Sequence, residues 1–435
     1  MFVLIICIII LFVLSIIFKI KPYITLLTAG LLSGLFLKIS FLNSLSFLFE
    51  GFKNIIIGIG PIILAGTILG KFLQETGSTK RMVSSLIAWF GLNRIPLTLN
   101  LLGFIISIPV FCDAAFILIS SVIKEISEVS GKKIIILAVC LATGLYSAHV
   151  FVPPTPGPLA AAAILNVDIG LLLIVGLFTG LFISLVGYLW IRLLFKKDFK
   201  INYKNEEIKS YNFEKSFFIF LPIIIPIILI SFSTILKYPL FDFIGKNLFN
   251  VINFIGKPEI ALIIGVLISI FFVDKSSSKA VPKWILDSLK KSFDILLITG
   301  AGGAFGFVIR SSGIIDSLSL NNINGIISII TVFIISASIK TVQGSSTVAL
   351  ITTCALVAPL IQSLGITSEI EKVILLISIG SGAMTISHVN DSYFWVVSKY
   401  SDIKMNEALK FFSSATLIQG VFGLLISISL YICLT

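Results

Sequence analysis

Two histidines and their neighbours mark a candidate site in this chain of 435 residues. His149 and His388 each lie in an apolar segment that polar residues and prolines interrupt, AHVFVPPTPGP and SHVNDSYFW. Because a polar group in hydrocarbon is costly, an ionisable residue inside a membrane-spanning segment is a functional-site hypothesis. One interruption in each half of the chain is typical of a transporter whose binding site lies between two repeats.

Four titratable residues are candidates for ion coupling: Asp113, Asp391, His149 and His388. We expect partial burial to raise the pKa of both carboxyl groups toward physiological values, unless a cation lies close. The imidazoles already titrate near that range, so each histidine is either a proton relay or a buried ring held by hydrogen bonds. Asn390, a candidate for the substrate, could instead bind sodium together with Asp391.

A second group of residues could bind an organic anion. Lys340 is a cation in an apolar environment, and neutral hydrogen-bonding groups follow it at the start of an apolar helical arm: Gln343, Ser345, Ser346 and Thr347. Free N–H groups in the first turn of that arm also favour an anion. Alternatively, Lys340 extends its charge to the membrane surface or pairs with Asp113 or Asp391, and the hydroxyl groups only cap the helix.

The first interruption, VPPTPGP, contains three prolines close together. Proline has no amide donor and releases the carbonyl groups of the preceding turn from helical bonding. Those carbonyls, with Pro154 and Thr155, could face the hydroxyl groups of a substrate. The alternative for each of Pro153, Pro154 and Pro156 is a structural kink.

The composition requires a membrane protein. Hydrophobic residues make up 57% of the chain and charged residues 12%, and the mean hydropathy is +1.11, far from a soluble average. The first apolar run has no basic region before it and reads as a spanning helix rather than a signal peptide. The five cysteines form no metal-binding pattern. No P-loop, HExxH or GxSxG motif occurs, so we expect no enzyme, no cofactor, and no catalytic or metal site.

The apolar segments predict an all-α polytopic fold. Ten spans are expected, near residues 2–18, 22–39, 54–74, 132–165, 169–195, 216–236, 258–273, 293–311, 370–398 and 407–434. Two further stretches, 97–128 and 324–363, have a polar centre between two short apolar arms. Each is predicted to be a re-entrant hairpin, because non-helical backbone at membrane depth must line a cavity or be buried in protein.

The distribution of positive charge predicts an orientation. With both termini outside, most of the 32 Lys and Arg residues lie on the cytoplasmic side, including those of the basic loop 196–215. We read that loop as a solvated linker, close to anionic lipid in one alternative. The formal net charge of +11 therefore needs no nucleic-acid partner to explain it.

The two halves of the chain can be aligned with each other. Three glycines in the first half align with three in the second at a constant offset of 236 residues: Gly66, Gly70 and Gly77 with Gly302, Gly306 and Gly313. The two histidines align at an offset of 239 residues. The prediction is a first repeat over 1–195, the linker 196–215, and a second, inverted repeat over 216–435. Each repeat has five spans and one hairpin, with broken helices at the midplane. Close helix packing through GxxxG contacts is the alternative reading of the glycines.

Four motifs occur in order along nearly the whole chain: PVFCDAA, VPPTPGPLAAAAIL, TVQGSSTVALITT and GSGAMTISHVNDSYFW. They resemble the signatures of the gluconate permease family, which are proton-coupled carriers of gluconate and related hydroxy acids. The resemblance implies a symporter in the bacterial inner membrane, in a superfamily whose folds use inverted repeats, paired hairpins and broken helices. Many such carriers are homodimers.

The leading prediction is therefore a secondary transporter that imports gluconate or a related sugar acid with protons by alternating access. Another aldonate, a uronate, glycerate and D-serine stay open as substrates, because each carries a carboxylate near a hydroxyl group. Sodium coupling is an alternative to proton coupling. A channel and a membrane-embedded enzyme are the other classes considered.

Overall fold

The computed structural model describes residues 21–435, except 80, 83–84, 86–88, 90–93, 197, 199–215, 237–245, 275–276, 313–324 and 390. The predicted span 2–18, most of the linker, Gly313 and Asn390 lie outside the described residues.

The described elements are helices. In the first half they are α2 (Pro22–Phe36), α3 (Phe41–Glu75), α5 (Ile95–Ser107), α6 (Cys112–Ser130), α7 (Ile134–Phe151), α8 (Pro156–Leu165) and α9 (Ile169–Leu194). The second half has α10 (Leu221–Ile235), α11 (Lys246–Ile255), α12 (Pro258–Ile270), α13 (Val281–Ser311), α14 (Ile326–Gln343), α15 (Ser346–Val357), α16 (Glu369–Met384), α17 (Ser392–Tyr400), α18 (Met405–Ala408) and α19 (Ser414–Leu434). This confirms the all-helical class.

Six of the described helical segments are long and apolar enough to cross a membrane, or up to eight if each bent pair is counted as one span. The predicted helix boundaries differ most from those of the structure at two long helices. α3 begins at Phe41 instead of residue 54, and α13 begins at Val281 instead of residue 293. Both early portions contain charged residues, such as Lys53 and Asp287, which lower the hydropathy without ending the helix. α11 was not predicted as a separate helix.

Helix breaks interrupt the chain at the positions where the sequence has prolines or polar clusters. α7 ends at Phe151 and α8 starts at Pro156, so VPPT forms the break. α16 ends at Met384 and α17 starts at Ser392. The two stretches predicted as hairpins each contain two helices with a short turn between them, α5 with α6 and α14 with α15.

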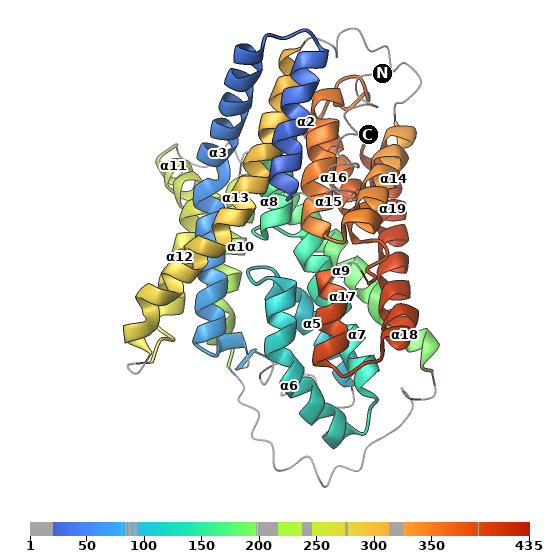
Figure 1. Cartoon of the computed structure of the whole chain (residues 1–435). Helices are drawn as coiled ribbons and strands as arrows, with labels where there is room; N and C mark the ends of the chain where they lie inside the picture. The colour runs from blue at the N-terminus through green and yellow to red at the C-terminus, as the bar shows by residue number, and fades with distance from the viewer. Residues whose placement is uncertain are drawn as a thin grey trace.

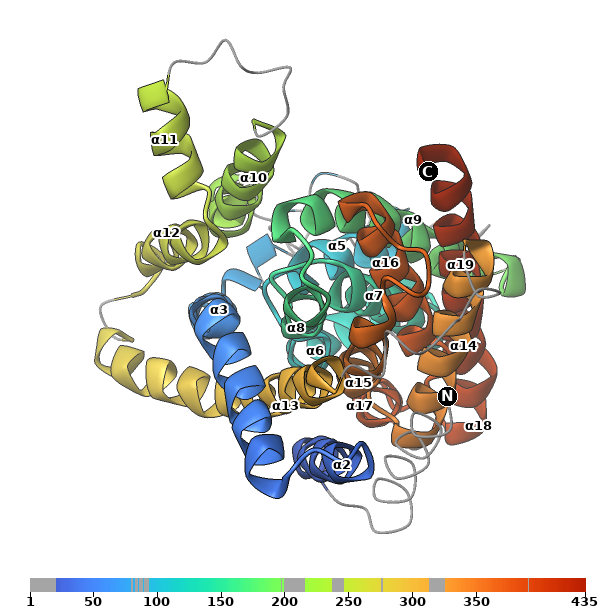
Figure 2. The same cartoon turned by 90° about the horizontal axis from the view of Figure 1, so that it is seen from above.

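The helices form two groups (Figures 1 and 2). α2, α3 and α13 lie side by side, with α10, α11 and α12 beyond them. The other helices make a compact bundle. α3 and α13 approach closely because glycine faces glycine: a Cβ at Gly51 would lie 2.7 Å from the carbonyl oxygen of Gly303.

A buried polar network joins helices of the compact bundle. The Asn100 side-chain amide of α5 donates to the Cys140 carbonyl at 3.0 Å and accepts from the Ser184 hydroxyl at 2.8 Å. Gln419 of α19 donates to the carbonyls of Thr143 and Ile183. Such interhelical hydrogen bonds fix helices together where lipid supplies no alternative partner.

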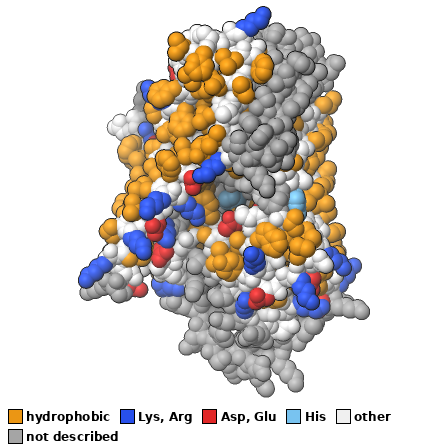
Figure 3. All heavy atoms as spheres, in the orientation of Figure 1, with side chains coloured by type: hydrophobic (Ala, Val, Ile, Leu, Met, Phe, Trp, Pro, Cys, Tyr) orange, Lys and Arg blue, Asp and Glu red, His pale blue; other side chains and the backbone are white. Residues whose placement is uncertain are grey.

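The outer surface matches a membrane setting (Figure 3). Hydrophobic side chains cover much of the upper part of the face shown, and charged side chains gather in its lower part. Large apolar side chains such as Phe178, Phe218 and Phe271 are exposed. This chain is a multi-pass membrane protein.

Candidate functional site at the helix breaks

A buried ion pair stands at the centre of the candidate site. Lys340, in the last turn of α14, lies 2.5 Å from Asp391, the residue that caps the start of α17. Their side chains are 0% and 4% exposed. The structure therefore has the Asp391 pairing, one of the alternatives considered for Lys340. In this conformation the ammonium group is already neutralised by a carboxylate.

Local structure explains why both charges are tolerated. The carboxyl end of a helix favours a cation and the amino end favours an anion, and Lys340 and Asp391 occupy those ends. Asp391 also accepts hydrogen bonds from the Ser387 hydroxyl at 2.5 Å and the Tyr393 amide at 3.0 Å. A buried charge needs such additional bonds because its partner alone does not offset the loss of water.

A π-helical turn, Leu409–Ser413, contacts the break between α16 and α17. Its Ser413 hydroxyl donates to the Ser387 carbonyl, and the Ser387 amide donates to the Thr416 hydroxyl at 3.0 Å. The Phe412 ring packs edge-on against Tyr393, with centroids 5.6 Å apart. Non-helical backbone at the break thus has hydrogen-bond partners within the protein. π-turns of this kind are frequent at functional sites.

The start of α15 is the second part of the site. The Ser345 side chain caps the helix by accepting from the Val348 amide at 3.4 Å, which is the contact that the capping alternative describes. Thr347 lies against α8: its hydroxyl is 3.3 Å from His149 Nε2, and Gly157 packs beside it. The amino ends of α8 and α15 therefore meet, and their first-turn N–H groups favour a negative charge between them.

Both histidines contact the α14–α15 pair. His149 reaches Thr347 just after the turn, and His388 Nε2 lies 3.0 Å from the Thr341 carbonyl oxygen just before it. His388 is consistent with the hydrogen-bonded alternative. The other ring nitrogen of His149, Nδ1, is buried and has no hydrogen-bond partner among the described residues. The two rings thus contact the two sides of the same turn, between α14 and α15.

Asp113 approaches these charges from α6. It lies in the first turn of α6 and interacts electrostatically with Asp391, Lys291 and Lys340. The Tyr393 ring packs against α6 and α7, with its centroid 6.2 Å from that of Phe116 and 5.3 Å from that of Tyr146. The structure thus brings Asp113, Asp391 and Lys340 into one electrostatic group.

The remaining predicted residues have less prominent places. The Thr155 hydroxyl is buried and donates to the Val152 carbonyl at 2.5 Å, so it is engaged by its own backbone. Pro154 lines a small apolar crevice with Ile108 and Pro109 of the α5–α6 turn. Ser346 is buried at the start of α15, and Gln343 is half-buried at the end of α14.

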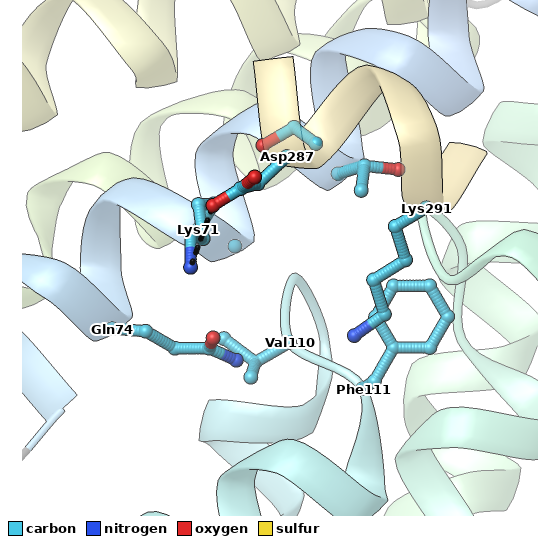
Figure 4. A pocket seen from close by; sticks show the side chains of 9 residues that line it. Lys71, Gln74, Val110, Phe111, Asp287 and Lys291 are labelled. Carbon is cyan, nitrogen blue, oxygen red and sulfur yellow. Dashed lines mark ion pairs between the residues drawn. The ribbon is translucent and has the colours of Figure 1, made fainter. Parts of the chain in front are cut away.

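A second charged cluster, not predicted from the sequence, lines a cavity of about 120 Å³ beside the α5–α6 turn. It is formed by α3, α13 and that turn: Thr67, Gly70, Lys71, Gln74, Val110, Phe111, Asp287, Ser288 and Lys291. Figure 4 shows these side chains around a common space. The prediction placed the span of α13 after residue 293, which left Asp287 and Lys291 outside it. Their spacing of four residues was the available signal.

Comparison with known proteins gives the family. The sequence profile of the GntP family permeases matches residues 1–433. An uncharacterized permease of Haemophilus influenzae is 32% identical over 88% of this chain and 82% of its own length. The high-affinity gluconate transporter of Escherichia coli K12 is 30% identical over 96% of both chains. The D-serine transporter DsdX of the same organism is also 30% identical, over 96% of this chain and 95% of its own.

Solved structures support the fold alone, because sequence identity to them is low. The MtrF protein of Neisseria gonorrhoeae, from a class of antimetabolite efflux pumps, superposes with a TM-score of 0.63 over 91% of this chain and 86% of its own, at 14% identity. The YdaH transporter of Alcanivorax borkumensis gives 0.61 over 89% and 88%, also at 14% identity. The family and the sequence relatives are permeases and transporters, not enzymes, and the chain belongs to the GntP permease family.

Proposed function

We propose that this protein is a proton-coupled importer of gluconate or a closely related small hydroxy acid. The family and the gluconate transporters among its relatives support the substrate class. The observation that carries the proposal is the buried Lys340–Asp391 pair at the meeting point of the helix ends. In this contact, Lys340 is the proposed receptor for the substrate anion and Asp391 is the proposed proton acceptor.

The pair suggests how coupling works. While Asp391 is ionised, it is paired with Lys340, and a substrate carboxylate finds no free cation at the helix breaks. A proton that neutralises Asp391 removes this competitor, because the attraction between the two side chains depends on both charges. Lys340 then accepts the substrate carboxylate. Proton and anion binding therefore favour each other, as symport requires.

The neutral groups of the site would hold the rest of the molecule. Side-chain hydroxyl and amide groups, together with the backbone of the first turn of α15, bind the substrate hydroxyls. The residues assigned to this role are Gln343, Ser345, Ser346, Thr347, Asn390, Pro154 and Thr155. Asp113, His149 and His388 are assigned to the proton route. Thr347, which contacts His149, links the two sets.

The proposal extends to the whole architecture. Two inverted repeats, 1–195 and 216–435, carry one re-entrant hairpin each, α5–α6 and α14–α15, and alternate the access of the site between the two sides. The protein lies in the inner membrane of a bacterium with both termini outside, and it forms a homodimer.

Reconstitution into liposomes tests the function. Purified protein should accumulate radiolabelled gluconate above its external concentration when the lumen is alkaline, and it should do so in sodium-free buffer. Accumulation that requires a sodium gradient would replace the proton by sodium. Equilibration without accumulation would contradict symport and indicate a channel.

D-serine is the second candidate substrate, because DsdX is as similar to this chain as the gluconate transporter is. Competition in the same assay separates the two. Excess unlabelled D-serine should leave gluconate uptake unchanged if the substrate is a sugar acid. Inhibition by D-serine, with labelled D-serine itself accumulated, would instead identify an amino-acid carrier.

A further inference from the structure

We propose that the cavity beside the α5–α6 turn is a second anion subsite, in which Lys291 binds the carboxylate of the transported acid. This inference rests on the proposed function and adds a binding residue to it. The subsite lies between α3 and α13 on one side and the helix turn on the other. It is thus separate from the Lys340–Asp391 pair, whose cation is already occupied.

One of the two lysines that line the cavity, Lys291, has no ion-pair partner among the described residues, and the acid that acts on it electrostatically is Asp113. Lys71 lies 2.7 Å from Glu75 and 4.0 Å from Asp287. Asp287 precedes Lys291 by four residues on α13, the spacing at which a helix normally pairs an acid with a base. The carboxylate is instead drawn toward Lys71 (Figure 4). Among the described residues, no carboxylate forms an ion pair with Lys291.

Lys291 points across the cavity to an aromatic ring. Its ammonium nitrogen lies 3.9 Å from the centroid of Phe111, which positions a cation through the electron density of the ring face. A ring cannot neutralise the charge, so the ammonium retains hydrogen-bonding capacity for an incoming anion. Lys291 is exposed at the surface of the chain, on the wall of the cavity.

The other lining groups fit a hydroxy acid. Thr67, Gln74 and Ser288 carry neutral polar groups that can pair with hydroxyls, and Val110 and Phe111 supply an apolar wall. The chemistry is that of a compact carboxylate bearing hydroxyl groups, bound by one point charge and several neutral donors and acceptors.

Phe111 connects the subsite to the central site. One contact of its ring is Lys291, and its centroid lies 6.2 Å from that of His149, which in turn contacts Thr347. The turn that carries Phe111 therefore stands between the cavity and the start of α15. A substrate held on Lys291 is one aromatic side chain away from the groups assigned to its hydroxyls.

Equilibrium binding of radiolabelled gluconate to purified protein in detergent tests the subsite. Lys291→Gln should raise the dissociation constant about tenfold or more, the scale of a lost charge-assisted hydrogen bond. Lys290→Gln is the matched control, because it removes the same charge from the next residue of α13 and does not line the cavity. It should stay within about twofold. Lys291→Arg should recover most of the affinity.

The outcomes separate the subsite from the proposed function. Wild-type protein that binds neither gluconate nor D-serine would overturn the proposed function itself. Normal affinity in Lys291→Gln, or an equal loss in Lys290→Gln, would overturn the subsite alone. Gln74→Ala is the milder variant if Lys291→Gln is not monodisperse in size-exclusion chromatography. It should weaken binding about threefold, and unchanged binding would count against the subsite.

Discussion

Two clusters of lysine and aspartate have the same residue types but differ in burial and in how their charges pair. At the helix breaks, Lys340 and Asp391 are sealed from solvent and 2.5 Å apart. Beside the α5–α6 turn, Lys71 and Asp287 are 26% and 40% exposed and 4.0 Å apart, and Lys291 is left without an ion-pair partner. Burial forces charges to pair, whereas exposure lets one stay available.

Under the two proposals, each cluster has a separate task. The sealed pair responds to a proton, because protonation of Asp391 removes the charge that holds Lys340. An open cluster responds to an anion, because an unpaired ammonium can exchange water for a carboxylate. The two proposals thus place coupling and substrate capture in neighbouring parts of the molecule, with Phe111 in contact with both Lys291 and His149.

The largest expected effect comes from breaking the sealed pair. Asp391→Asn leaves Lys340 buried without its counter-charge, and removing one partner of a buried pair costs about 3–5 kcal/mol. We expect a clearly lower unfolding temperature in detergent and no concentrative uptake. Asp402→Asn is the control, since it removes the carboxylate of an exposed pair with Lys124. It should change stability by about 1 kcal/mol or less.

A double variant separates the stability of the pair from its function. Lys340→Met combined with Asp391→Leu removes both charges and should regain most of the stability lost in the single variant, because well-packed apolar residues often replace a buried pair at no cost. Uptake should remain absent. A stable double variant that still accumulates gluconate would show that the pair is only structural.

The contact between α3 and the α5–α6 turn should show an intermediate effect. A Cβ at Gly70 would lie 2.4 Å from the carbonyl oxygen of Pro109, so Gly70→Ala must displace the turn that carries Phe111. Overpacking of this kind costs about 1–3 kcal/mol, and we expect a higher KM for gluconate uptake. Gly58→Ala on the same helix meets nothing within 4 Å. If both variants behave alike, the turn does not depend on this contact.

The smallest effect is expected at the open cluster. Asp287→Asn removes a weak, partly exposed ion pair with Lys71, so its unfolding free energy should change by less than about 1 kcal/mol. Gluconate should bind modestly more tightly, because a negative charge leaves the wall of an anion cavity. Asp294→Asn on α13 does not line the cavity and serves as the reference. Weaker binding in Asp287→Asn would argue that the carboxylate organises the subsite.

Much of the helical layout could be predicted because its signals are local. Segments such as 169–195 and 216–236 are continuous apolar runs, and their helices end within a few residues of the predicted bounds. The prolines of VPPTPGP and the polar SHVND run mark the two breaks for a similar reason. The start of α13 was missed because its charged residues continue the helix beyond its most apolar part, which hydropathy alone does not detect.

The site was only partly predictable. Asp113, Asp391, Lys340 and Thr347 were singled out from their residue types in an apolar context, and the first three interact in the structure. Lys291 was not singled out, because nothing in its neighbourhood along the chain indicates that a ring from residue 111 will lie beneath it. The role of each candidate in transport remains a prediction.

By itself, the sequence determined a helical membrane protein of a permease family, together with the positions where its helices break. Hydrophobicity and proline act on neighbouring residues, so these features need no knowledge of distant contacts. Only the tertiary structure decided that Lys340 meets Asp391, 51 residues away, and that Lys291 lies over the Phe111 ring without an ion pair to any described carboxylate. The pairing of each charge depends on which helix ends face each other, and the packing of the whole bundle determines which helix ends do so.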